Sequence, residues 1–190
     1  SDIVANASAT GNVTTTGQQV GGLIGHHHTG TILRNVTATG DVSTDGQRVG
    51  GLVGDTKASI TDASATGEVT TSTTGEYVGG LVGQLQAQHG DEEVRNVTAS
   101  GNVSSGGQRV GGLIGYVRDD GTHYVAMSEA HATGNVNTTY AGGSNAYVGG
   151  LVGHFEGSEF TDISATGDVT STAGNEVGGL VGRVAMERNN

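Results

Sequence analysis

Cysteine, proline and tryptophan are absent from this chain of 190 residues, and aromatic residues make up only 4% of it. Without cysteine the chain has no disulfide, no thiol nucleophile and no zinc–thiolate site. So few bulky side chains cannot fill a wide interior, so any hydrophobic core has to be narrow. We therefore expect backbone pairing to supply most of the stability.

Basic residues are also scarce. Eight lysines and arginines, among which Lys57 is the one lysine, stand against 19 acidic residues and give a net charge of -11. This charge repels phosphate backbones and argues against nucleic acid as a partner. An acidic composition with almost no lysine predicts either a protein of a high-salt habitat or an ordinary surface protein of low pI.

Long apolar runs are missing too. No stretch approaches the roughly 18 apolar residues of a membrane span, and no charged segment followed by an apolar one opens the chain. We expect Ser1 to be a mature or trimmed start.

Glycine is abundant, with 36 residues, and it follows a pattern. The hexapeptide Val-Gly-Gly-Leu-(Ile/Val)-Gly occurs six times, at intervals of 29, 29, 32, 38 and 29 residues. A period of this length indicates a repeat architecture. The copies begin at Val20, Val49, Val78, Val110, Val148 and Val177.

The segment before each hexapeptide alternates with a period of two, as a half-buried strand does. In the second repeat Val36, Ala38, Gly40 and Val42 share one face. Two inward columns follow across the repeats: Ala9, Ala38, Ala65, Ala99, Ala132 and Ala165, and then Val13, Val42, Val69, Val103, Val136 and Val169. The hexapeptide leucines give a third column, the predicted repeat core: Leu23, Leu52, Leu81, Leu113, Leu151 and Leu180.

These columns predict an all-β fold, a β-solenoid (β-helix) of six repeats of about 29 residues, with residues 1–190 as a single domain. The approximate repeats are 3–31, 32–59, 60–93, 94–125, 126–159 and 160–190. Each repeat shows two clear strands and a short third one, near Ile32–Arg34 or Ile60. Pairing the two strands of each repeat as an antiparallel hairpin is the alternative. The Gly-Gly pair indicates a bend, a bulge or a close approach of two backbones.

The hexapeptides, each preceded by Ala-(Thr/Ser)-Gly-x-Val, resemble the GLUG-motif repeats of extracellular bacterial and archaeal proteins, over essentially the whole chain. The resemblance implies a β-solenoid like those of filamentous-haemagglutinin-type adhesins. It also implies an extracellular or cell-surface location and a structural or adhesive role, and it supplies no catalytic residues.

Six asparagines lie in Asn-x-Ser/Thr sequons, which accept N-linked glycans outside the cell. A chain rich in Asn, Ser and Thr forms such triplets by chance, yet some recur at equivalent repeat positions. We expect a glycoprotein with candidate sites at Asn6, Asn12, Asn35, Asn96, Asn102 and Asn137.

Metal or catalytic chemistry finds little support in the sequence. The cluster His26–His28 has the ligand type of a transition-metal site, but the equivalent positions hold Asp55, Gln84, Tyr116, His154 and Arg183, which form no recurrent ligand set. Two acidic columns could bridge calcium, but the calcium-binding nonapeptide is absent, so a solvated face is expected. These columns contain Asp41, Glu68 and Asp168, and Asp62, Glu129 and Asp162. His131 replaces a Ser or Thr of its column and is interpreted as drift. We expect no cofactor and no enzyme activity.

The sequence therefore predicts a non-catalytic structural protein, a subunit of a head-to-tail surface filament or the stalk of an adhesin. Neither end has a capping repeat, so self-association through the terminal coils is expected. The alternative is a ligand-binding module. It would bind ice through a Ser/Thr ladder, or cell-surface glycans through the inserted loops at 84–93, 116–124 and 138–146, which carry or adjoin Tyr116, Tyr124, Tyr140 and Tyr147. The ladder contains Ser8, Thr10, Thr37, Thr39, Ser64, Thr66, Thr98, Ser100, Ser164 and Thr166.

Overall fold

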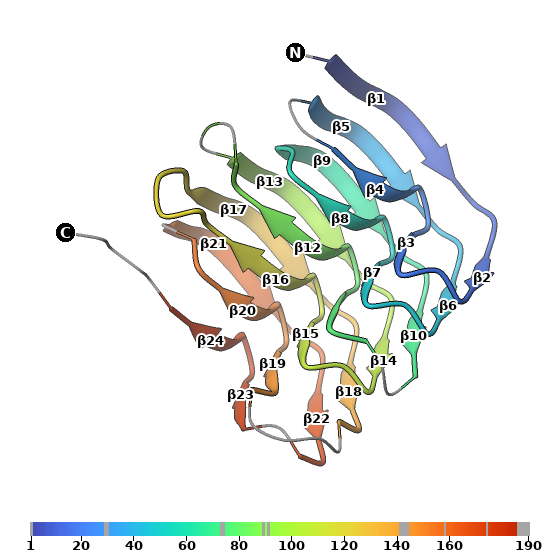
Figure 1. The fold of residues 1–190 in the computed structure, drawn as a ribbon, viewed down its shortest axis with the longest axis vertical. Helices are drawn as coiled ribbons and strands as arrows, with labels where there is room; N and C mark the ends of the chain where they lie inside the picture. Colours follow the sequence, from blue (N-terminus) through green and yellow to red (C-terminus); the bar gives the residue numbers. More distant parts are fainter. Residues whose placement is uncertain are drawn as a thin grey trace.

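The computed structural model of the chain describes residues 2–28, 31–72, 75–88, 90, 92–140, 145–157, 159–173 and 175–185. Within these ranges every regular element is a β-strand, and the strands form four six-stranded sheets, A to D. Four consecutive strands, one in each sheet, make one coil. Figure 1 shows the coils side by side, from blue at the N-terminal end to red at the C-terminal end. The predicted β-solenoid is confirmed.

The strand bounds repeat from coil to coil. Sheet A contains β1 (Asp2–Ala9), β5 (Thr31–Ala38), β9 (Ile60–Ala65), β13 (Glu92–Ala99), β17 (Val125–Ala132) and β21 (Glu159–Ala165). Sheet B contains β2 (Val13–Thr15), β6 (Val42–Thr44), β10 (Val69–Thr71), β14 (Val103–Ser105), β18 (Val136–Thr138) and β22 (Val169–Ser171). Sheet C contains β3 (Gln19–Gly21), β7 (Arg48–Gly50), β11 (Tyr77–Gly79), β15 (Arg109–Gly111), β19 (Tyr147–Gly149) and β23 (Glu176–Gly178). Sheet D contains β4 (Ile24–His27), β8 (Val53–Thr56), β12 (Val82–Gln86), β16 (Ile114–Arg118), β20 (Val152–Phe155) and β24 (Val181–Val184).

All pairings are parallel and join equivalent residues of neighbouring coils. Ala38 pairs with both Ala9 and Ala65, and Val42 pairs with both Val13 and Val69. The same register continues to the last coil, where Ala165 pairs with Ala132. The hairpin alternative is therefore wrong, because a hairpin pairs strands in antiparallel orientation.

Each coil has four strands rather than the two or three predicted, because both predicted strands are divided. The first is divided between sheets A and B, and the hexapeptide is divided between sheets C and D. In the second repeat Val49 and Gly50 end β7, Gly51 and Leu52 form a bend, and Val53 begins β8. A Cβ on Gly50 would lie 2.1 Å from the carbonyl oxygen of Val53, and one on Gly51 would lie 2.2 Å from that of Gly80. The bend therefore needs glycine for both its tightness and the contact with the next coil.

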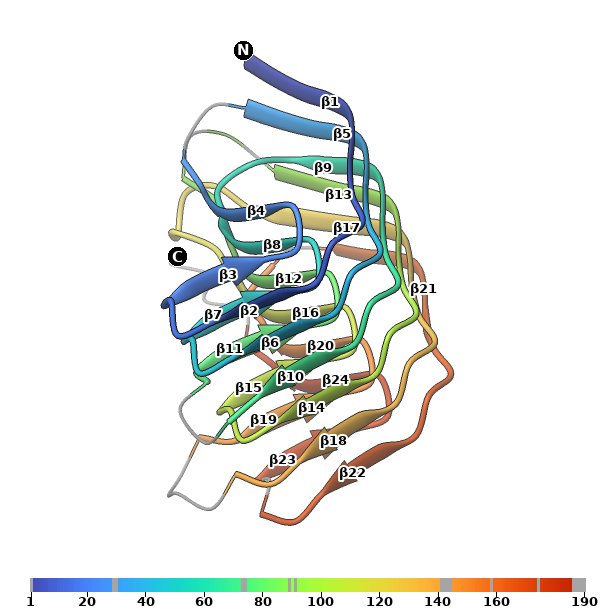
Figure 2. The ribbon, with the colours of Figure 1, turned by 90° about the vertical axis from the view of Figure 1, so that its right-hand side faces the viewer.

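Two narrow cores run along the stack. The larger lies between sheets A and D and contains the hexapeptide leucines, together with residues such as Leu33 and Val36. The smaller contains valines of sheets B and C, such as Val42 and Val49. Figure 2 shows how each coil runs along sheet A, turns into sheet B and returns through sheets C and D. Burying each leucine fully contributes about 1.5–3 kcal/mol.

Strict alternation fails in the middle of the sheet A strands. In β5 Leu33 and Val36 are buried, while Arg34 and Asn35 between them are both exposed. Asn35 has a φ of 52°, in the left-handed region, and the pairing with β1 passes over it. We call this the bulge column; it consists of Asn6, Asn35, Asp62, Asn96, Glu129 and Asp162, all with φ between 49° and 55°. The predicted shared face of Val36, Ala38, Gly40 and Val42 therefore begins only after the bulge.

Candidate functional site

Polar side chains meet where the outward faces of sheets C and D adjoin the Gly-Gly bend. We call this two-column cluster the polar seam. Sheet C contributes Gln19, Arg48, Tyr77, Arg109, Tyr147 and Glu176, and sheet D contributes His26, Asp55, Gln84, Tyr116, His154 and Arg183. Within each column the residues are partners in the parallel ladder, so they lie one coil apart. The seam is the largest concentration of charged and aromatic groups that the described residues bring together.

Arg109 is the centre of the seam. Its guanidinium carbon lies 4.7 Å from the ring centroid of Tyr116, 5.0 Å from that of Tyr77 and 5.7 Å from that of Tyr147. Its Nε donates to His154 Nδ1 at 3.2 Å, and the His154 ring stacks on Tyr116 at 4.9 Å. Such cation–π contacts strengthen when water is excluded. Arg109 therefore holds three coils and both sheets together.

Titration behaviour in this part of the seam follows from burial. Burial, together with the positive charges of Arg109 and Arg183, lowers the pKa of His154 to about 4. Burial also raises the pKa of Tyr116, as does the hydrogen bond that its hydroxyl donates to Glu156 at 2.8 Å. The described structure thus favours a neutral imidazole and a protonated phenol.

Asp55 lies at the other end of the seam and is only 4% exposed. It accepts a hydrogen bond from Gln19 Nε2 at 3.3 Å and lies 3.8 Å from Arg48 Nε and 3.5 Å from His26 Nδ1. Burial raises its pKa, although the positive charge of Arg48 acts in the opposite direction. The carboxylate therefore takes part in a cluster of ion pairs rather than facing solvent.

The seam also holds every buried side-chain atom that has no hydrogen-bond partner among the described residues. These atoms are Arg48 Nε, Asp55 Oδ1, Gln84 Oε1 and His154 Nε2. Two of these atoms still lie near a carboxylate oxygen, Arg48 Nε at 3.8 Å from Asp55 and His154 Nε2 at 3.6 Å from Glu156. Because the rings and charges are buried against one another, the seam acts as a cross-brace between sheets C and D.

The predicted histidine cluster is divided by the structure. His26 faces Asp55, whereas His27 is buried, 3.4 Å from Thr56 Oγ1, and burial lowers its pKa. Within the described ranges no three His, Cys, Asp or Glu side chains converge on a point that could hold a metal ion. His131 lies 2.8 Å from Ser164 Oγ, as a member of its ladder.

The six sequon asparagines are all exposed, at three places on the outer surface of sheets A and B. Asn6, Asn35 and Asn96 belong to the bulge column, in which the acidic residues Asp62, Glu129 and Asp162 also lie. Asn12 and Asn102 lie where sheet A turns into sheet B, and Asn137 lies on the outer face of β18. Of the predicted core leucines, Leu52, Leu81, Leu113 and Leu151 are fully buried, and Leu23 and Leu180 of the end coils are partly buried.

The turn from sheet A to sheet B has a second ladder, which we call the corner column. Its members are Asn12, Asp41, Glu68, Asn102, Asn135 and Asp168. The side-chain oxygen of Asn12 accepts the backbone N–H of Asp41 at 2.9 Å, and Asp41 and Asn102 accept from the next coil in the same way. Asp41 thus shares a structural role with the asparagines of this column, which sequence reasoning missed.

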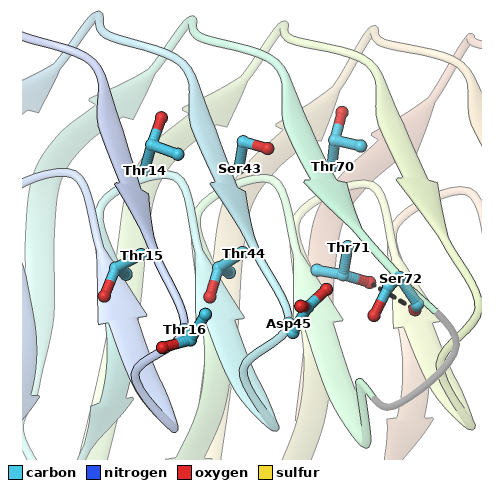
Figure 3. Close-up of a pocket in the computed structure, with 9 residues that line it drawn as sticks. All are labelled: Thr14, Thr15, Thr16, Ser43, Thr44, Asp45, Thr70, Thr71 and Ser72. Carbon is cyan, nitrogen blue, oxygen red and sulfur yellow. Dashed lines mark hydrogen bonds between the residues drawn. The ribbon is translucent and has the colours of Figure 1, made fainter.

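The hydroxyl residues of sheet B form one outward and one inward ladder. Figure 3 shows Thr14, Ser43 and Thr70 on one side and Thr15 and Thr44 on the other, around a shallow depression. The inward hydroxyls accept backbone N–H groups of the turn to sheet C, for example from Gly17 to Thr15 at 3.1 Å and from Gly46 to Thr44 at 3.0 Å. The inner row therefore caps turns.

The tyrosines of the inserted loops do not share one environment. Tyr116 and Tyr147 are 8% and 6% exposed, within the polar seam, whereas Tyr124 is 39% exposed. Tyr116 and Tyr147 belong to strands β16 and β19 rather than to the inserted loops, and they pack on Arg109 and His154. The insertion at 138–146 includes residues 141–144, which lie outside the described ranges.

Among the residues that the structure describes, no helix is long and apolar enough to cross a membrane. No solved structure matches the chain. Halomucin of Haloquadratum walsbyi is 92% identical to it over 189 residues, which are 98% of this chain and 2% of that protein. The chain thus corresponds to a small part of a very long relative. The family model of the GLUG motif matches residues 16–43, 45–70, 74–104 and 144–170, more than half of the chain. With its predicted repeats and its β-solenoid fold, the chain belongs to the GLUG-motif family.

Proposed function

We propose that this chain is a non-catalytic structural segment of an extracellular surface protein, in which it acts as a rigid stalk. The observation that carries the proposal is the uniform register of all four sheets over six coils. Equivalent residues stack on one another in every coil, so each coil resists bending in the same way. Long-range backbone pairing of this kind suits a spacer.

The charge of the chain and its family support a location outside the cell, in a salt-rich medium. The net charge of -11 and the nearly lysine-free composition suit a salt-rich medium. A relative from the halophile Haloquadratum walsbyi agrees with this setting. The proposal for the chain also agrees with the polar seam, in which the charged groups are occupied with one another rather than directed at a substrate.

We extend the proposal to contacts between stalk segments. The outermost strands of each sheet pair on one side only, and Val177 is 48% exposed where the equivalent Val148 is fully buried. Such an edge accepts a further coil with the same columns. The next coil belongs either to the same longer chain or to another copy, and the second case would generate a filament.

A tandem fusion of two copies in register tests the stalk. At about 4.8 Å per coil, six added coils should lengthen the particle by roughly 29 Å in small-angle X-ray scattering. A fusion with a long Gly/Ser linker is the control and should give a broad range of lengths. An in-register fusion that behaves like the linker control would overturn the stalk.

Two further measurements test location and assembly. Antibodies raised against the chain should label intact cells of the source organism, and labelling only after lysis would contradict the extracellular location. Sedimentation of a single copy over a range of concentrations then separates the two kinds of contact. A rising mass supports assembly between copies, whereas a constant monomer limits stacking to one longer chain.

A further inference from the structure

The structure separates four of the six sequon asparagines, Asn35 and Asn96 from Asn102 and Asn137, by what their side-chain amides already do. In the bulge column Asn35 Nδ2 donates to Asn6 Oδ1 and Asn96 Nδ2 donates to Asp62 Oδ1, both at 2.6 Å. The backbone of Asn35 and Asn96 is left-handed, a conformation in which a short polar side chain helps to hold the chain. A sugar on either nitrogen would push against a neighbouring coil about 4.8 Å away.

In the corner column the fold depends on the side-chain oxygen rather than on the amide nitrogen. Asn102 Oδ1 accepts the N–H of Asn135 at 3.0 Å, toward the next coil, and its Nδ2 donates to Oε1 of the long, exposed Glu68 side chain at 3.2 Å. Asp41 performs the same backbone contact without any amide nitrogen. The fold therefore needs only the side-chain oxygen at this position. The amide nitrogen can carry a substituent and still keep one N–H.

Asn137 lies beside Asn102 on the outer surface. It is exposed on β18, in register with Ser104 and Thr170. A shallow polar depression joins the two sequons. Its lining includes Asn102, Ser104, Asn135, Asn137, Asp168 and Thr170. Amide, hydroxyl and carboxylate groups of this kind are partners for the hydroxyls of a sugar.

We infer that N-linked glycans are attached at Asn102 and Asn137, where the first sugars lie over this depression, and that Asn35 and Asn96 stay unmodified. In the attachment, a bond forms between the asparagine Nδ2 and the anomeric carbon of a sugar-phosphate donor. The bond from that carbon to the phosphate oxygen breaks, the phosphate leaves with the bonding electrons, and Nδ2 gives one proton to a base of the transferase. The inference rests on the extracellular location proposed above.

Glycopeptide mass spectrometry on protein isolated from the source cells tests the inference. Peptides that contain Asn102 and Asn137 should carry a saccharide mass. Peptides that contain Asn35 and Asn96 should not, nor should Asn135, which is a corner residue outside any sequon. Modification of Asn35 or Asn96, or bare asparagine at both 102 and 137, would overturn the inference. If antibodies label the protein on intact cells but both asparagines are unmodified, the glycan inference is wrong while the proposed extracellular stalk stands.

Matched variants separate the glycan from the fold. Ser104→Ala removes the sequon of Asn102 while leaving both hydrogen bonds of the Asn102 side chain in place, and Asn137→Thr copies Thr170 of the same column. Expressed in the source organism, each variant should lose the saccharide from its own site only. Expressed in a host that adds no glycans, both should melt within about 2 °C of the parent, since exposed substitutions are nearly neutral. A saccharide that persists on the peptide of a variant would show attachment elsewhere.

Discussion

Glycine controls the distance between coils at individual residues. Gly101 follows the inward alanine of its strand, and a Cβ placed on it would lie 1.9 Å from the carbonyl oxygen of Gly67 in the preceding coil. The equivalent glycines at 40, 67, 134 and 167 show the same contact, at 2.0–2.1 Å. No side chain fits there unless the coils separate, which would lengthen the backbone hydrogen bonds beside it.

We therefore expect Gly101→Ala to lower the free energy of unfolding by about 1–3 kcal/mol or more, as overpacking does. Gly11→Ala is the matched control. It occupies the same repeat position, but a Cβ there meets nothing within 4 Å, so it should be close to neutral. Urea unfolding of the two variants measures the difference. Equal losses in both would show that the contact between coils is not the cause.

Protonation of His154 should destabilise the polar seam as the pH falls. Its pKa is about 4 in the folded chain, against a usual value near 6.5, so the unfolded chain binds the extra proton first. The contribution of neutral His154 to the free energy of unfolding is complete above pH 6.5. It is lost as the pH falls toward 4, up to roughly 3 kcal/mol in total. From pH 3.8 upward the raised pKa of Asp55 acts in the opposite direction, because the folded chain holds that proton more tightly than the unfolded chain does.

The matching experiment compares the parent chain with His154→Gln, which introduces the side chain that Gln84 already has in this column. The free energy of unfolding of the parent should fall more steeply between pH 6.5 and 4 than that of the variant. Identical slopes would contradict the assignment to His154. Comparing the two proteins removes the contributions of His27 and Asp55, which both share.

At the scale of the strand, the bulge column determines which side chains face inward. A left-handed residue between Leu33 and Val36 lets both of these point into the core, with two exposed residues between them. Non-glycine residues adopt this conformation at a cost of about 1–2 kcal/mol, and Asn and Asp tolerate it best. This explains why the position holds asparagine or aspartate in five of the six coils; Glu129 in the remaining coil is not explained by it.

We expect Asn96→Ala to destabilise the chain by about 1–2 kcal/mol, because alanine meets the left-handed penalty and also loses the hydrogen bond to Asp62. Asn96→Gly separates the two effects. Glycine removes the backbone penalty, so it should be less harmful than alanine although it lacks the side chain as well. Thermal unfolding orders the variants, and a glycine variant less stable than the alanine variant would contradict the backbone argument.

The recurring alanines and valines were enough to predict the inward columns of sheets A and B, because small residues at a fixed period favour the stacking of like on like. They did not predict that the segment divides into two strands, and they left the hairpin alternative open. The four-strand coil was not predictable, since Gly50 and Gly51 indicate a bend, a bulge or a close approach equally well. The polar seam was hidden for another reason. Gln84, Tyr116 and His154 occupy the same column but have side chains of different chemical types. Their partners come from the sheet C column, whose side chains are equally varied.

At the scale of the whole molecule, two cores, a polar cross-brace and an acidic outer surface have different physical roles. The cores depend on burial and do not weaken in salt. Exposed carboxylates repel one another across the short distance between coils, as Asp41 and Glu68 do in the corner column. The net charge of -11 adds a general repulsion that opposes the compact state in dilute buffer.

Salt should therefore stabilise this solenoid. Raising the salt from about 0.01 M to 1 M shortens the screening length from about 30 Å to 3 Å, below the spacing of neighbouring coils. We expect the melting temperature to rise over this range. Glu68→Gln should raise the melting temperature at low salt and flatten its salt dependence, since the amide oxygen can still accept from Asn102.

Glu93→Gln is the control for charge removal, because Glu93 lies 3.2 Å from Arg95 and its charge is attracted rather than repelled. Its removal should leave the low-salt melting temperature unchanged or slightly lower, as exposed ion pairs contribute about 0–1 kcal/mol. If both variants gained the same stability, total charge alone would explain the salt effect. A gain confined to Glu68→Gln would place the repulsion in the stacked carboxylates. It would also explain why six members of the corner and bulge columns are asparagines rather than acids, namely Asn6, Asn12, Asn35, Asn96, Asn102 and Asn135.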